Sequence, residues 1–142
     1  MQEQIIESIN YLLVQICKAQ RGKAQELLAK IELHPGQEML LLCLWPGDGP
    51  TQSELAGDLC ISPATMTKML DRMAKAGLVE RRTDVEDQRV SRVYLTGEGW
   101  SLREPVEGIW NKIEAQSLVN LTLDERILLR RLLLQVYENL TR

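Results

Sequence analysis

Apolar residues recur at helical spacing in the first third of the chain. Residues 5–29 predict a first helix, although Gly22 weakens it. A second helix is expected to begin at His34, because the histidine can serve as N-cap and Pro35 suits the first helical position. The run 39–44 is apolar nearly all round, which predicts that this second helix is buried.

Two helices with well-defined starts follow a turn-rich loop. Thr51 and Glu54 have the spacing of a capping box, so a third helix should begin there and end near Leu59. After a short turn, Ser62 is expected to cap a fourth helix that has proline in its first turn. Gly77 is expected to end this helix.

The hydrophobic period then changes from helical to alternating. Residues 78–82 predict one short strand and residues 90–95 a second, because β-branched and aromatic residues are frequent in them. The polar, acidic stretch 83–88 between them is typical of a hairpin tip.

Helical spacing returns in the last third of the chain. Thr96 should cap a long helix, and Pro105 in its interior should kink it because proline lacks the backbone N–H. Thr122 and Glu125 form another capping box, and the last helix should run to about Leu140.

This order of elements predicts a fold that is mainly α with a small β-hairpin. Two helices joined by a short turn form a helix-turn-helix, whose second helix can enter the major groove of DNA. The hairpin after it would be the wing. We therefore expect a winged helix-turn-helix at about residues 35–96, flanked by helices at about 2–30 and 97–140.

The charge distribution changes how the net charge of −3 should be interpreted. An acidic chain as a whole argues against nucleic acid, but DNA meets only one face of a protein. The fourth helix carries three cationic residues against one acid, and the hairpin carries four arginines in a charge-balanced segment. Arginine suits phosphates and narrow minor grooves. The two elements expected to read DNA are therefore a helix with a net positive charge and a hairpin that is rich in arginine.

Four segments carry a resemblance to a known family. They are Ile61–Met73, Gly77–Arg82, Asp84–Arg89 and Leu95–Thr96, and in order and spacing they resemble the MarR family of transcription regulators. The flanking helices agree in number and length, so the resemblance covers nearly the whole chain as a single domain, residues 1–142.

The resemblance implies the roles of several elements. Residues 62–76 would be the recognition helix and residues 78–95 the wing, with Arg89 entering the minor groove and Asp87 bracing it. Val85 stands where the family commonly has proline, which implies a looser tip. The family forms homodimers through its first helix and its last two helices, and the last helix here has more apolar residues than one core-facing stripe needs.

The predicted site residues fall into three groups. Those expected to contact double-stranded DNA are Ser62, Thr65, Thr67, Lys68, Arg72, Arg89 and Arg92. Asp87 and Arg81 are expected to support the wing. Those expected in the dimer interface are Ile5, Ile9, Leu12, Leu129, Leu133 and Val136.

No metal site or cofactor is expected. The three cysteines are widely spaced, and we expect reduced, mostly buried thiols. In one branch of the family a cysteine early in the first helix senses organic hydroperoxides; that position falls near Asn10, and Cys17 lies about two helical turns beyond it. We therefore expect no redox sensing by Cys17.

Together these features predict a DNA-binding transcription regulator, a ligand-responsive repressor that acts as a homodimer on a pseudo-palindromic operator. The alternative is a protein–protein interaction module on a winged-helix scaffold.

An enzyme is not expected, because no residues around the single histidine resemble a catalytic nucleophile beside a general base. Without an apolar run long enough to span a membrane, we expect a soluble, cytoplasmic protein. Family members often bind small aromatic or amphipathic effectors, and whether this chain does so stays open.

Overall fold

The computed structural model describes residues 2–47 and 49–142, which form helices and one two-stranded antiparallel sheet. The predicted fold class is confirmed. Contacts divide the chain into two compact units, residues 1–110 and residues 111–142. The elements are α1 (Gln2–Ile6), α2 (Ile9–Ala29), α3 (Gln37–Leu44), α4 (Gln52–Asp58), α5 (Pro63–Lys75), β1 (Val79–Thr83), β2 (Ser91–Leu95), α6 (Gly97–Ser101), α7 (Arg103–Ser117) and α8 (Leu123–Leu140).

The two helices of the helix-turn-helix begin where the sequence predicts. The Thr51 hydroxyl accepts the Glu54 N–H at 3.1 Å, and the Glu54 carboxylate accepts the Thr51 N–H at 3.1 Å. Ser62 caps α5, and Gly77 follows the end of that helix with φ of 77°. The predicted caps are confirmed, because short polar side chains there satisfy N–H groups that a first helical turn leaves unpaired.

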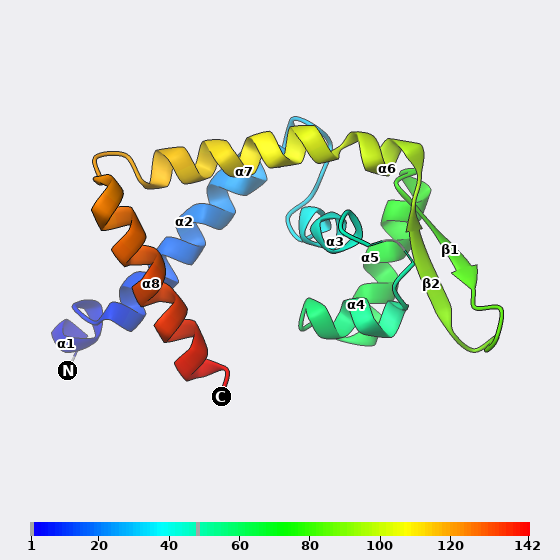
Figure 1. Ribbon diagram of the computed structural model, residues 1–142, viewed down its shortest axis with the longest axis horizontal. Coiled ribbons are helices and arrows are strands. Elements are labelled where there is room, and N and C mark those ends of the chain that lie inside the picture. Colours follow the sequence, from blue (N-terminus) through cyan, green and yellow to red (C-terminus); the bar gives the residue numbers. More distant parts are fainter. Residues whose placement is uncertain (1, 48) are drawn as a thin grey trace. The chain divides into compact units, whose positions relative to one another are not determined.

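The wing is a hairpin that is extended by a short stretch of the preceding loop. β1 and β2 pair antiparallel with Val79 opposite Leu95, and in Figure 1 the hairpin projects beyond α4 and α5. The Gly49 N–H donates to the Val93 carbonyl at 3.0 Å, and the Val93 N–H donates to the Pro50 carbonyl at 3.0 Å. The base of the wing is therefore tied to the loop that leads into α4.

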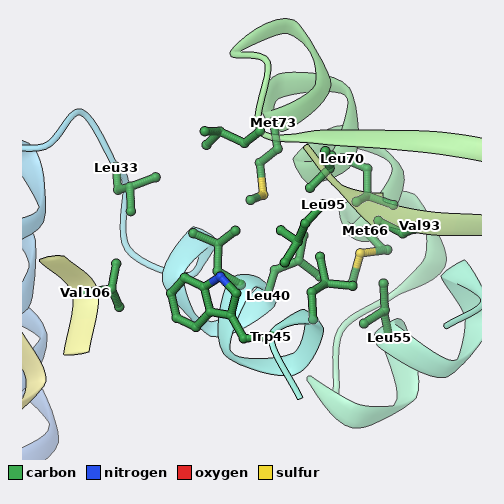
Figure 2. Close-up of a cluster of buried hydrophobic side chains, with 14 of the residues drawn as sticks. Leu33, Leu40, Trp45, Leu55, Met66, Leu70, Met73, Val93, Leu95 and Val106 are labelled. Carbon is green, nitrogen blue, oxygen red and sulfur yellow. The ribbon is translucent and has the colours of Figure 1, made fainter. Parts of the chain in front are cut away.

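One apolar core holds α3, α4, α5 and the wing together. Figure 2 shows side chains from these elements converging, and Trp45 lies among them with its indole N–H donating to the Gly99 carbonyl at 3.2 Å. The fully buried side chains are Leu28, Leu40, Leu41, Leu44, Leu55, Met66, Leu70, Met73, Val93 and Val106. This core fixes the recognition helix against the base of the wing.

The predicted start of the second helix is wrong. α3 begins at Gln37, after a turn in which the His34 carbonyl accepts the Gln37 N–H at 3.1 Å. Gly36 is the N-cap, with φ of 96°, which a residue with a side chain rarely adopts. The Glu38 carboxylate accepts the Gly36 N–H at 2.9 Å, and no side chain of the described residues caps the first turn of α3 in place of His34.

Two predicted helices are interrupted. Ser8 separates α1 from α2, since its hydroxyl oxygen accepts the Tyr11 N–H at 3.1 Å and caps a new helix. The helix expected to kink at Pro105 ends instead at Ser101 and resumes at Arg103. Pro105 has no N–H for the carbonyl of Ser101, four residues earlier, so the break falls one turn before the proline.

The second unit contains the end of α7 and all of α8. The predicted capping box is confirmed, because the Thr122 hydroxyl accepts the Glu125 N–H and the Glu125 carboxylate accepts the Thr122 N–H. The Arg126 guanidinium donates to the carbonyls of Leu118 and Leu121, at 3.0 and 3.2 Å. These bonds hold the turn between α7 and α8, although none of the residues of α8 is buried within the chain.

Candidate nucleic-acid interface

α5 presents one apolar and one polar face. Met66, Leu70 and Met73 are fully buried, which fixes the rotation of the helix about its axis. The exposed polar side chains on the remaining surface are Thr65, Thr67, Lys68, Asp71, Arg72 and Lys75. Lys68 and Arg72 have no ion-pair partner among the described residues. Their charges are therefore available to an external anion.

The first turn of α5 is shaped by its cap. The Ser62 oxygen accepts the Thr65 N–H at 3.1 Å, and its hydroxyl lies 2.9 Å from the Thr65 hydroxyl oxygen. Both side chains are exposed at the positive end of the helix dipole. This end can offer hydroxyl groups to a phosphate or a base edge.

The one acidic residue of α5 is neutralised by the wing. Arg81 of β1 donates to the Asp71 carboxylate at 2.6 Å. The pair links the recognition helix to the first strand of the wing, which fits the supporting role expected of Arg81. Because Arg81 neutralises the charge of Asp71, the outward face of α5 is more cationic than the charged residues of the helix alone suggest.

The wing tip carries an exposed arginine, Arg89, that is paired with Asp87. The Arg89 side chain is 92% exposed, and its Nε lies 3.1 Å from the Asp87 carboxylate, which also accepts the Arg89 N–H at 3.0 Å. The hydrogen bond from the Arg89 side chain lowers the pKa of Asp87. The Asp84 carboxylate accepts the Asp87 N–H at 3.0 Å, so the turn at the wing tip orients Asp87.

Arg92, predicted to contact DNA, is occupied inside the wing. Its Nε donates to the Asp84 carboxylate at 2.7 Å, and its Nη1 donates to the Gly49 carbonyl at 2.8 Å. The hydrogen bond from Arg92 is the largest cause that lowers the pKa of Asp84. Arg92 therefore ties the wing to the loop before α4 through two of its five N–H donors, and its role as a DNA contact stays a prediction.

Three further side chains of this surface were missed by sequence reasoning. The Gln52 amide nitrogen donates to the Thr67 hydroxyl oxygen at 2.7 Å, across the gap between α4 and α5. The Arg82 guanidinium lies 4.1 Å from the centre of the Tyr94 ring, a cation–π contact between the strands. No local signal in the sequence marks Gln52, but Arg82 and Tyr94 lie in diagonal positions that the strand register brings together.

The predicted dimer residues lie on surfaces that the chain leaves open. On α1 and α2, Ile5, Ile9 and Leu12 are exposed; on α8, Leu129 and Leu133 are exposed and Val136 is half-buried. In the second unit an open groove between α7 and α8 is lined mainly by leucine, isoleucine and arginine side chains. Apolar surface of this extent is typical of a protein–protein contact.

The cysteines differ from the prediction of mostly buried thiols. All three are free, but Cys17 and Cys60 are exposed and Cys43 is half-buried. Burial is the main cause that raises the pKa of the Cys43 thiol. Over residues 2–47 and 49–142, no group of three or more histidine, cysteine or acidic side chains could hold a metal ion. Within the same residues no helix is long and apolar enough to cross a membrane.

Comparisons with known proteins match this arrangement. The model of the MarR family matches residues 33–91. The chain is 32% identical over 106 residues to the HTH-type transcriptional regulator TtmR of Methylorubrum extorquens (strain PA1), covering 74% of this chain and 53% of that protein. It is 31% identical over 94 residues to the organic hydroperoxide resistance transcriptional regulator of Bacillus subtilis (strain 168), covering 66% of this chain and 64% of that protein.

A solved structure agrees along most of the chain. Wild-type MarR from E. coli, in its apo form, superimposes with a TM-score of 0.80 and 26% identity, covering 91% of this chain and 96% of that one. Residues 33–91 are therefore similar to the MarR family, and the fold of most of the chain is that of a MarR structure. Members of this family are transcriptional regulators and not enzymes, in line with the prediction from the sequence. The chain spans 53% to 64% of the length of the two curated relatives named above.

Proposed function

We propose that this chain is a sequence-specific transcription regulator that binds double-stranded DNA, with α5 in the major groove and the wing in the minor groove. One observation carries the proposal: Lys68 and Arg72 on α5, and Arg89 at the wing tip, hold exposed charges that the core of the fold does not use. The proposal assigns base contacts to the exposed hydroxyl groups of Ser62 and Thr65 at the N-terminus of α5, together with Thr67.

The regulator acts as a homodimer in this proposal. The support is the exposed apolar surface of α8, where Leu129 and Leu133 lie, and of α2, where Ile9 is 75% exposed. Covering such surfaces with a second copy stabilises both chains by removing apolar area from water. A two-fold dimer needs a pseudo-palindromic operator with half-sites about one helical turn apart.

The proposal extends to repression, since a dimer seated on an operator within a promoter excludes RNA polymerase by its bulk. It places the chain in the cytoplasm, where its DNA is, and takes residues 1–142 as one functional domain. A small aromatic or amphipathic effector stays a prediction. Trp45 is not available to such a ligand, because it is 5% exposed and its indole N–H is bonded to Gly99.

The test is an anisotropy titration of the full chain with duplex DNA from upstream of its own gene. Arg89→Ala should weaken binding by about 1–3 kcal/mol per half-site, because a fitted groove contact is lost. The matched control is Arg103→Ala, which removes an exposed arginine that pairs with Glu107 on α7, away from the wing. Its affinity should stay near that of the wild type.

Circular dichroism separates a binding defect from a folding defect. Both variants should keep the wild-type spectrum, since Arg89 and Arg103 are exposed. Equal affinity of Arg89→Ala and the wild type would overturn the assignment of the wing. A wild-type chain that binds no DNA sequence above background would favour the protein–protein interaction module instead.

A further inference from the structure

Gln52 and Thr67 form a hydrogen-bonded pair on the surface proposed to face DNA. Gln52 is the first residue of α4, and Figure 1 shows α4 and α5 side by side. The Gln52 amide nitrogen lies 2.7 Å from the Thr67 hydroxyl oxygen, which lies 3.0 Å from the Pro63 carbonyl oxygen. Thr67 is exposed and Gln52 half-exposed, so the pair borders solvent.

The chemistry of these contacts fixes the direction of each hydrogen bond. A carbonyl oxygen only accepts, so the Thr67 hydroxyl hydrogen is spent on Pro63. The Thr67 oxygen then only accepts, and Gln52 must present its amide nitrogen to it. This orients the Gln52 amide, whose oxygen and second N–H have no protein partner in the part of the chain that the structure describes.

We infer that Gln52 and Thr67 act as one base-reading unit that selects adenine in each half-site; this inference rests on the proposed function. A glutamine amide presents a donor beside an acceptor, which matches N7 and the N6 amino group of adenine in the major groove. Guanine presents two acceptors there, so the amide oxygen would face the guanine O6 unpaired. Gln52 contributes the base contact, and Thr67 is the positioning residue that holds its amide in one orientation.

The Thr67 oxygen adds a discrimination against guanine and thymine. The hydroxyl group keeps acceptor capacity but no free hydrogen. It therefore cannot donate to guanine O6 or N7, nor to thymine O4, whereas it can accept from an amino group. Both members of the pair therefore disfavour guanine, and Gln52, which needs an acceptor beside a donor, distinguishes adenine from cytosine.

The test selects bound sequences from a random double-stranded DNA library with the full chain and sequences them. The wild type should show one position per half-site at which adenine is preferred by about 5- to 150-fold. Gln52→Met keeps the length of the side chain but removes both hydrogen-bonding groups, so it should reduce this preference to about two-fold or less. Other positions should keep their preferences.

Two isosteric variants sharpen the readout. Gln52→Glu offers only acceptors, so the preferred base at the same position should change to cytosine, which presents the N4 amino donor. Its fold is expected to survive, because an acid suits the first turn of a helix. Thr67→Val loses the hydroxyl, frees the amide to turn, and should admit guanine at that position. Ser53→Ala, a neighbour on α4 with an exposed side chain, is the control and should keep the wild-type profile.

The outcomes separate the inference from the proposed function. A Gln52→Met chain that selects the same sequences as the wild type, at equal or uniformly lower affinity, would show a merely structural pair and overturn the inference alone. A wild-type chain that enriches no sequence would overturn the proposed function, and the inference with it. If Gln52→Met loses the adenine preference at one position of the half-site and keeps the preferences at all others, the result supports both the inference and the proposed function.

Discussion

Replacement of Gly99 by alanine should destabilise the junction between α6 and the wing. A Cβ atom on Gly99 would lie 2.2 Å from the Leu78 carbonyl oxygen and 2.9 Å from Leu95 Cδ2. An unstrained carbon–oxygen contact is about 3.3 Å, so helix and strand would have to separate by about 1 Å. The Leu78 carbonyl accepts the Thr96 N–H, and the Gly99 carbonyl accepts the buried indole N–H of Trp45, so both bonds would be stretched.

The magnitude follows from these terms. Overpacking costs about 1–3 kcal/mol, and a weakened buried hydrogen bond costs about 1–3 kcal/mol more. Alanine regains up to about 1 kcal/mol of helix propensity over glycine. The net loss in free energy of unfolding is therefore about 3 kcal/mol. The matched control is Gly97→Ala in the same helix, where a Cβ atom would meet nothing within 4 Å.

The assay is urea unfolding followed by circular dichroism, with all chains at one concentration because a dimer unfolds in a concentration-dependent way. Gly97→Ala should be as stable as the wild type or slightly more stable. If Gly99→Ala unfolded at the same urea concentration as Gly97→Ala, the close packing of α6 on Leu78 would not limit this position, and the reasoning would fail.

Three further results are expected. Glu38→Gln should stabilise the fold at neutral pH and not below about pH 4, because burial raises the pKa of Glu38. In the wild type, Glu38 contributes fully to the free energy of unfolding while its carboxyl group is protonated, and this contribution is lost as the pH rises through the raised pKa. Urea unfolding of both chains at several pH values checks this. Leu133→Asp should abolish the dimer and weaken binding to a full operator, with Gln135→Asp as control; sedimentation showing an intact dimer would contradict the interface. Cys17→Ser should have the same DNA affinity and the same response to organic hydroperoxide as the wild type, because Cys17 has no ion-pair or hydrogen-bond partner in the described residues. If organic hydroperoxide released the wild type from DNA but not the variant, this prediction would be contradicted.

Sequence reasoning predicted the elements well where the signals are local. The capping boxes at Thr51 and Thr122, the Ser62 cap and the switch to alternating residues in the wing all depend on neighbours within four residues. Such signals act through the backbone groups beside them, so one sequence is enough to place them. The family resemblance rests on the same segments.

The prediction failed where local signals competed. His34 and Pro35 suit a helix start, yet α3 begins only at Gln37, because Gly36 takes a positive φ and its N–H donates to the Glu38 carboxylate. Thiol burial was also misjudged: Cys17 lies on a face of α2 that the single chain leaves exposed. Neither outcome can be derived from spacing alone.

The sequence by itself determined the order of the elements, where most of them begin, and which of them carry positive charge. Only the tertiary structure decided how those charges are used. Arg89 and Arg92 are alike in the sequence, but the tip turn leaves Arg89 exposed, while Arg92 donates hydrogen bonds to Asp84 and Gly49. The same holds for Gln52, which meets Thr67 fifteen residues away. A hydrogen bond or ion pair between distant residues depends on packing that brings their elements together, and that packing is a property of the whole core.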